Sequence, residues 1–90
     1  MTLRYRKIRG IVYVFIENIF CGKDDIVYHG FLLPEGYRPS EDAQPYFPVG
    51  YMDSGGNSGM CKIKADGNIG AIGPTQNWYY CGYVSYPAEN

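Results

Sequence analysis

The sequence predicts a single all-β domain, a small antiparallel β-sandwich or jelly-roll-like fold with many turns. The strand-favouring residues Val, Ile, Thr, Tyr, Phe and Trp number 30 of 90, whereas the good helix formers Ala, Leu, Met, Glu, Gln, Lys and Arg number 24. The 12 glycines and 6 prolines suit short strands and tight turns better than long helices. A chain of this length forms one domain with a thin core, so residues 1–90 are expected to be a single unit.

Three strands are predicted in the first part of the chain, at residues 3–9, 11–20 and 26–33. The first alternates, with one face formed by Leu3, Tyr5 and Lys7 and the other by Arg4, Arg6 and Ile8. Gly10 marks a break or a bulge after it. The second strand is almost continuously apolar, which is typical of a strand covered on both faces. We therefore expect it at the centre of a sandwich or at a subunit interface.

The middle of the chain predicts a rigid turn followed by an irregular strand. In the segment 34–39, Pro-Glu-Gly-Tyr-Arg-Pro, both prolines fix φ and Gly36 has the freedom to adopt a positive φ. The next strand, at residues 46–52, is flanked or interrupted by Pro45 and Pro48. Because proline cannot donate to a ladder of backbone hydrogen bonds, we expect an edge strand or a bulged strand here.

The last third predicts a hairpin and a final strand. Strands at 60–65 and 68–72 are joined by Asp66-Gly67, a favoured pair for a two-residue type I′ turn. The final strand, at 78–86, has Trp78, Tyr80, Gly82, Val84 and Tyr86 on one face and Tyr79, Cys81, Tyr83 and Ser85 on the other. Several short strands joined by turns predict a sandwich or a barrel, and the pattern leaves the strand order open.

Composition excludes several classes of protein. The net charge is −1 and no charge block is long, so bulk electrostatics indicate neither a nucleic-acid nor a membrane partner. The longest apolar run, residues 11–16, is too short to cross a bilayer, and the N-terminal residues lack a signal-peptide pattern. Three widely spaced cysteines, Cys21, Cys61 and Cys81, are an odd number and predict free, mostly buried thiols made in a reducing cytoplasm.

Half of the basic residues lie in the first nine positions: Arg4, Arg6, Lys7 and Arg9. The other 81 residues carry 4 basic and 9 acidic side chains, a net charge of −5. A basic strand is compatible with nucleic-acid binding, but no basic loops flank it. We favour charge pairing with the acidic remainder of a neighbouring copy.

Several segments, taken in order, are similar to a known family. The residues are Tyr5 to Val14 (aromatic–basic–x–Ile–x–Gly–x–Val–aromatic–Val), Leu33 to Ser40 (Leu-Pro-Glu-Gly-Tyr-Arg-Pro-Ser), Tyr46 to Val49, Cys61 to Ile69 and Trp78 to Tyr86. Together they resemble the C-terminal receptor-binding or tip domain of tail, baseplate and tail-fibre proteins from phages of Gram-positive hosts. The resemblance spans roughly residues 3–87, and its most specific part is the stretch that begins at Leu33.

The resemblance implies an all-β homotrimer at the distal end of a virion adhesion device, assembled in the bacterial host cytoplasm. Many such modules contact host-surface saccharides, whereas others only cap or trimerise a fibre. It also implies that the chain is the tip of a longer protein. Because the loops of this family vary most, the resemblance assigns no binding residue.

Three patterns in the sequence suggest catalysis or metal binding, but each lacks a feature that the chemistry requires. Asp53-Ser54-Gly55-Gly56 is similar to a serine-protease nucleophile loop, but the single histidine, His29, is predicted within a strand, and the chain is too short for two barrels. A zinc site from His29 and the three cysteines lacks a Cys-x₂-Cys pair. The adjacent acids at 24–25 and 41–42 are better interpreted as solvated turn charges than as glycosidase carboxylates. We expect no cofactor, no metal and no enzymatic activity.

The ten tyrosines are the most informative feature for function. Tyrosine and tryptophan offer a flat apolar ring that stacks on a sugar, while Asn, Asp and Gln bind hydroxyl groups. The loops at 51–59 and 73–79 combine these types in Tyr51, Asp53, Asn57, Gln76, Asn77, Trp78 and Tyr79. The prediction is a non-enzymatic tip domain that binds a host cell-wall or capsular saccharide there. The alternatives are a purely structural trimerisation cap without a ligand, in which these rings fill the core and the interface, and a small hydrolase of the wall polymer.

Overall fold

The structure of the chain is a computed structural model that describes residues 1–23, 25–51, 57–73 and 78–89, without the side chains of residues 51, 57, 58 and 78. The described strands are β1 (Thr2–Ile8), β2 (Ile11–Cys21), β3 (Val27–Phe31), β4 (Tyr46–Tyr51), β5 (Asn57–Ile63), β6 (Asn68–Ile72) and β7 (Trp78–Pro87). A single 3₁₀ turn, η1 (Glu41–Ala43), is the one helical element of this part of the chain. The predicted all-β fold is confirmed.

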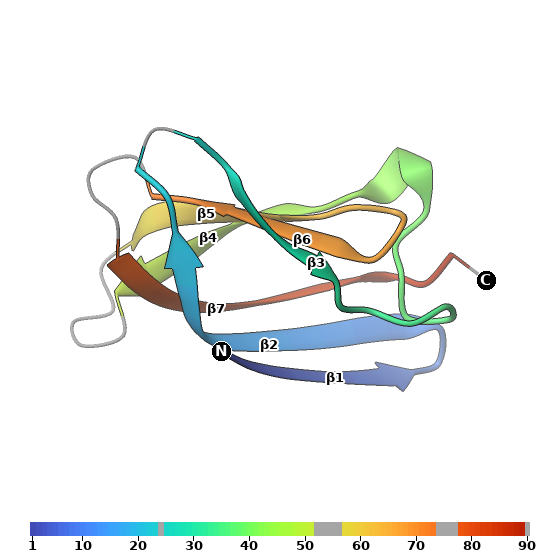
Figure 1. Ribbon diagram of the computed structural model, residues 1–90. Coiled ribbons are helices and arrows are strands. Elements are labelled where there is room, and N and C mark those ends of the chain that lie inside the picture. Colours follow the sequence, from blue (N-terminus) through green and yellow to red (C-terminus); the bar gives the residue numbers. More distant parts are fainter. Residues whose placement is uncertain (24, 52–56, 74–77, 90) are drawn as a thin grey trace.

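The strands form one curled antiparallel sheet in the order β1-β2-β7-β4-β5-β6-β3. Because the sheet curls, β1, β2 and β7 form one layer and β4, β5, β6 and β3 form a second layer across the core (Figure 1). The two layers also meet beyond the end of β2, where Gly22 bridges Ile72 and the Gly73 N–H donates to the Gly22 carbonyl oxygen at 2.8 Å. The arrangement resembles a small sandwich built from a single sheet.

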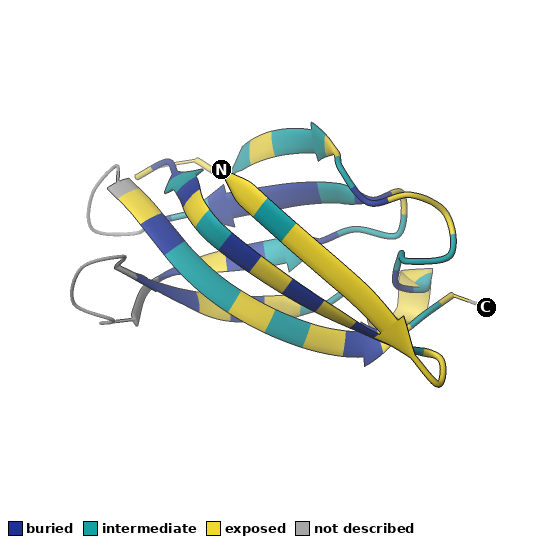
Figure 2. Ribbon diagram, turned by 90° about the horizontal axis from the view of Figure 1, so that it is seen from below, coloured by how far each residue is buried: buried dark blue, intermediate teal, exposed yellow. Residues whose placement is uncertain are grey.

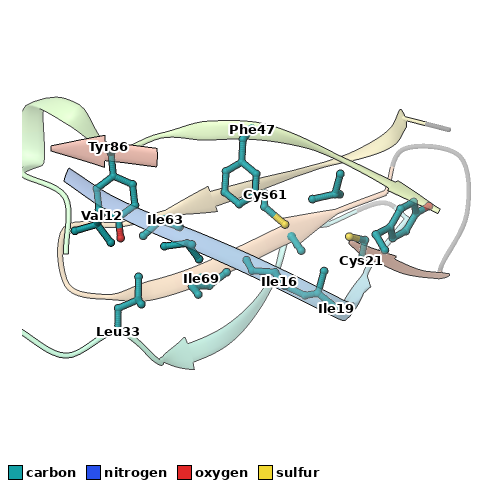
Figure 3. Close-up of a cluster of buried hydrophobic side chains, with 14 residues drawn as sticks. Val12, Ile16, Ile19, Cys21, Leu33, Phe47, Cys61, Ile63, Ile69 and Tyr86 are labelled. Atoms are coloured by element: carbon teal, nitrogen blue, oxygen red, sulfur yellow. The ribbon is translucent and has the colours of Figure 1, made fainter. Parts of the chain in front are cut away.

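The core lies between these two layers (Figure 3). Its fully buried members are Val12, Val14, Ile16, Ile19 and Cys21 of β2, Tyr80 of β7, Leu33, and Val49, Cys61, Ile63, Ile69 and Ala71 from the second layer, with Phe47 and Tyr86 almost as buried. The register pairs Leu3, Tyr5 and Lys7 with buried residues of β2, which confirms the predicted faces of the first strand. The described residues of β7 confirm the predicted alternation of the last strand as well.

The two hairpin turns differ from the sequence prediction. Arg9 and Gly10 both have positive φ, at 50° and 80°, and they join the paired residues Ile8 and Ile11. This is a two-residue type I′ turn, so Gly10 is neither a break nor a bulge. At the second hairpin only Gly67 has a positive φ, and its N–H donates to the Lys64 carbonyl oxygen. The predicted type I′ turn at Asp66-Gly67 is wrong: the turn is a longer one closed by a left-handed glycine.

A bulge in β2 explains its almost continuous apolar sequence. The register shifts between Ile16 and Ile19, and Asn18 takes a left-handed φ of 60°. Inward positions are therefore even-numbered before the bulge and odd-numbered after it, so that Ile19 and Cys21 still reach the core. The expectation that both faces of this strand are covered does not hold within the chain, because Tyr13 and Phe15 are exposed.

β4 is bulged, as predicted from its prolines, but it is not an outer strand of the sheet. The register with β5 shifts between Val49 and Gly50. Only Gly50 and Tyr51 pair with β7, so the residues from Tyr46 to Val49 have a ladder on one side alone. Pro48 therefore lies where its missing N–H leaves no partner unsatisfied. The outer strands of the sheet are β1 and β3.

The segment 33–39 closes the end of the molecule at which β7 finishes. Leu33 and Pro39 are fully buried, and the Tyr37 N–H donates to the Pro34 carbonyl oxygen across a turn in which Gly36 has a φ of 90°. The Arg38 Nε–H donates to the Leu33 carbonyl oxygen at 2.8 Å. The rigid turn predicted for this segment is confirmed, and its role in the fold is to cover the core.

Candidate functional site

The strand ends that flank the two predicted binding loops lie side by side. Tyr51, at the end of β4, pairs with Tyr80 of β7, and Trp78 begins β7 opposite Cys21. Asn57 begins β5 and pairs with Gly50. The backbone therefore brings the flanks of both loops together at one end of the sheet, as the sequence prediction of a shared site requires.

Six of the seven predicted site residues have no described side chain. Asp53, Gln76 and Asn77 lie outside the described residues, and Tyr51, Asn57 and Trp78 are placed by backbone alone. Tyr79 is described: its side chain is exposed, and its ring meets the Phe20 ring edge to face with a centroid distance of 5.5 Å. The saccharide site at these loops stays a prediction. Tyr79 lies at the border between the predicted site and the neighbouring exposed surface.

A second surface, which the sequence analysis missed, lies on the outer side of β1, β2 and β7. We call Tyr13, Phe15 and Tyr83 the aromatic face. The register places Phe15 between Arg4 of β1 and Tyr83 of β7, and it places Tyr13 between Arg6 and Ser85. Figure 2 shows exposed positions alternating with buried ones along β2, beside a β1 that is exposed over most of its length.

The rings of the aromatic face are open to solvent, on a part of the sheet where Tyr13 and Phe15 have paired neighbours in both β1 and β7. Tyr13 is 40% exposed, Phe15 is 52% exposed and Tyr83 is 73% exposed. The Phe15 and Tyr83 rings stack on each other, with centroids 5.8 Å apart and planes 28° apart. Large exposed apolar clusters on small domains mark interaction sites more often than isolated exposed residues do. Tyr79 lies on the same side of β7, so this surface extends towards the predicted loops.

Two shallow hollows adjoin on this surface, and both are lined by Tyr13 and Phe15. The larger, about 530 Å³, is also lined by Arg4, Tyr5, Arg6 and Ile8. The smaller, about 250 Å³, reaches Tyr83, Val84 and Ser85 on β7. The two hollows lie next to each other because they share the Tyr13 and Phe15 rings in their walls, and together they reach from β1 to β7.

The alternation of exposed and buried residues along β2 held the signal for this surface. Tyr13 and Phe15 alternate with Val12, Val14 and Ile16, which is the pattern of a strand with one wet face. Both sets were expected to be covered, because aromatic side chains, like aliphatic ones, are apolar. The structure shows these rings to be exposed, because no further layer of the described chain covers this side of β2.

The outer side of the other layer carries rings of a different kind. The Lys62 ammonium lies 4.9 Å from the centre of the Tyr46 ring, and the Lys64 ammonium lies 5.5 Å from that of Tyr28. Cations thus already occupy these ring faces from within the chain. Phe15 and Tyr83 instead meet each other, and their contact leaves both rings largely exposed.

Of the side chains that suggested catalysis or metal binding, His29 and two of the cysteines make contacts within the described fold. The His29 Nε2–H donates to the Phe20 carbonyl oxygen at 2.8 Å, because a carbonyl is only an acceptor. A hydrogen bond to Cys21, together with burial, raises the pKa of the Cys61 thiol, which keeps that thiol protonated. Cys21, Cys61 and Cys81 are free thiols, and the first two are buried. No group of three His, Cys, Asp or Glu side chains within the described ranges is placed to hold a metal ion.

No family model, curated protein or solved structure matches this chain. Among residues 1–23, 25–51, 57–73 and 78–89 there is no helix of the length and apolar character that a membrane crossing needs.

Proposed function

We propose that this chain is a non-enzymatic tip domain of a phage tail or baseplate fibre that binds a host cell-surface saccharide. The exposed aromatic face carries the proposal: three rings are held open on a rigid sheet, a geometry suited to stacking on the C–H faces of sugars. The order of segments that resemble phage tip domains, with Leu33 to Ser40 as the most specific, supports the same assignment.

The binding surface in this proposal runs from the loops at 51–59 and 73–79, through Tyr79, to the aromatic face. Single contacts of a sugar with a shallow surface are weak. Three copies in a homotrimer, and several fibres in a virion, raise the effective concentration of sites so that weak binding holds the particle. The proposal places the domain at the tip of the virion, and it needs neither a cofactor nor a metal.

The test is binding of the purified domain to a panel of cell-wall and capsular polysaccharides from Gram-positive bacteria. We expect Tyr83→Ala and Phe15→Ala each to weaken binding by about two- to twelvefold, since a stacked ring contributes about 0.5–1.5 kcal/mol. Tyr46→Ala is the matched control, because Tyr46 is 64% exposed on the other layer. Trp78→Ala separates a site at the loops from one on the aromatic face.

Two results would contradict this function. A folded domain that binds no polysaccharide of the panel is not an adhesin of this type. Release of reducing ends from purified walls would make the chain a hydrolase, and we expect none.

A second function, a trimerisation cap without a ligand, is favoured by the same observation. A flat apolar face on a small domain gains stability when it is buried against another copy. The two functions differ in what covers the aromatic face in the assembled fibre: a saccharide, or a neighbouring chain.

A further inference from the structure

The four basic residues near the N-terminus separate into distinct environments. Lys7 is directed to the segment 33–39, where its ammonium donates to the Gly36 carbonyl oxygen at 2.9 Å and lies 5.5 Å from the centre of the Tyr37 ring. Arg9 belongs to the β1–β2 turn. Arg4 and Arg6 alternate on the other side of β1, and both line the larger hollow beside the aromatic face.

The hollow carries positive charge that the described part of the chain neutralises only in part. Its lining residues include two arginines and no acid. Arg4 lies 3.5 Å from the Glu17 carboxylate, but the two side chains are 71% and 46% exposed, so this pair is weak and exchangeable. The Arg6 side chain has no ion pair or hydrogen bond within the described part of the chain.

The register of the sheet places each of the two arginines opposite one aromatic residue of β2. Arg6 is opposite Tyr13 and Arg4 is opposite Phe15, and the two rows are about 7 Å apart along the strands. A guanidinium binds carboxylate and phosphate oxygens through paired N–H donors, while a ring packs on the apolar face of a sugar. The rows therefore alternate the two contacts that a charged sugar polymer offers.

We infer that the saccharide recognised by the aromatic face is anionic, and that Arg4 and Arg6 bind its carboxylate or phosphate groups. This inference rests on the proposed function and adds the chemical class of its ligand. A nucleic acid also combines negative charge with stacking surfaces. It is disfavoured because its phosphates are dense, because binding to them uses many cationic contacts, and because the chain beyond residue 9 has a net charge of −5.

The test is titration of the domain with four probes: polygalacturonate, a phosphomannan, neutral dextran and an oligothymidylate. Polygalacturonate and phosphomannan distinguish a carboxylate from a phosphate source. The expected result is binding to at least one of them that exceeds binding to dextran by about tenfold and weakens at high salt.

Variants locate the charge contacts. Arg6→Gln and Arg4→Gln should each weaken binding to the anionic polymer by about tenfold, with little change in binding to dextran. Arg9→Asn is the matched control, because it removes one charge from the same hairpin and asparagine tolerates the left-handed φ of this position. Its binding should stay within about twofold of the unmodified domain.

The outcomes separate this inference from the function beneath it. Equal binding of dextran and both anionic polymers, unchanged in the arginine variants, overturns the anionic ligand and leaves a saccharide-binding module standing. Preferential binding of the oligothymidylate overturns the inference in favour of a nucleic acid. Failure of a folded domain to bind any saccharide, in this test and in the polysaccharide panel, overturns both.

Discussion

Tyr86 shows how a single side chain fastens the last strand to the closing segment. The residue is 4% exposed, and its hydroxyl donates to the Tyr37 carbonyl oxygen at 2.6 Å. Burial raises the pKa of Tyr86 above its ordinary value. The neutral phenol is therefore the form that the folded state accepts.

The raised pKa of Tyr86 predicts a loss of stability at high pH. Below about pH 10 the phenol is protonated in both states, and above it the unfolded chain releases the proton first, so the free energy of unfolding falls as pH rises. We expect Tyr86→Phe to lower that free energy by about 1 kcal/mol near neutrality, through the lost hydrogen bond, and to remove this part of the pH dependence.

Urea unfolding of both proteins from neutral pH to pH 11 measures the effect of Tyr86. The buried thiol of Cys61 contributes a pH dependence of the same sign, but it is present in both proteins and cancels in the difference. A difference between the two proteins that stays constant with pH would contradict the assignment.

At the scale of elements, the segment 33–39 and the β5–β6 hairpin depend on one close approach. The Leu32 N–H donates to the Gly67 carbonyl oxygen at 3.0 Å. A Cβ atom placed on Gly67 would lie 2.4 Å from the Leu33 carbonyl oxygen, and its φ of 86° already disfavours other residues. Glycine is thus required at this turn for space as well as for conformation.

Gly67→Ala should destabilise the domain more than Gly10→Ala does. Gly10 has a similar φ of 80° but open space around it, so its substitution costs only the left-handed conformation, about 1 kcal/mol. The backbone clash at Gly67 should add about 1–3 kcal/mol to the same conformational cost. Urea titration of both variants measures the loss in the free energy of unfolding. Equal losses would show that the turn at Gly67 does not pack closely against Leu33.

The elements also show what the sequence predicts and where prediction stops. Alternation and composition place all seven strands and the faces of β1 and β7, because side-chain direction follows from a period of two. The turns were harder: the Asp-Gly pair suggested a type I′ turn, yet that turn forms at Arg9-Gly10, where strand register decides it. The bulge at Asn18 was not predicted, because an extra residue in a strand leaves no change of composition.

At the scale of the whole molecule, the candidate site divides in the same way. Tyr79 was predicted and is exposed, since it lies on the outer side of β7 close to the start of the strand. The aromatic face was missed: the alternation along β2 is compatible with one exposed face, but the local pattern does not tell whether another layer covers the side of Phe15 and Tyr83. Arg4 and Arg6 were noted for their charge, but their place beside the rings follows only from the pairing of β1 with β2.

The mass of the domain in solution tests its assembly. We expect light scattering to give about three times 10.2 kDa, and Tyr83→Ala to keep that mass while it loses saccharide binding. This result requires the aromatic face to stay open in the trimer. If Tyr83→Ala instead reduces the mass and Tyr46→Ala does not, the face is an interface between copies and the cap is the better assignment. A monomer at all concentrations would contradict the homotrimer.

Gly50 and Tyr51 pair with β7 near its start, whereas residues 33–39 close the opposite end of the molecule, where the Tyr86 hydroxyl donates to the Tyr37 carbonyl oxygen. The described strand residues nearest to segments 52–56 and 74–77 are paired: Tyr51 with Tyr80, Asn57 with Gly50, Ile72 with Met60 and Trp78 with Cys21. Under the proposed function, we expect changes in these segments to alter which saccharide is bound, while the buried contacts of Leu33 and Tyr86 at the other end stay intact. If the proposed function holds, the domain is a scaffold whose binding end can change, by natural variation or in a designed library, while its packed end is kept.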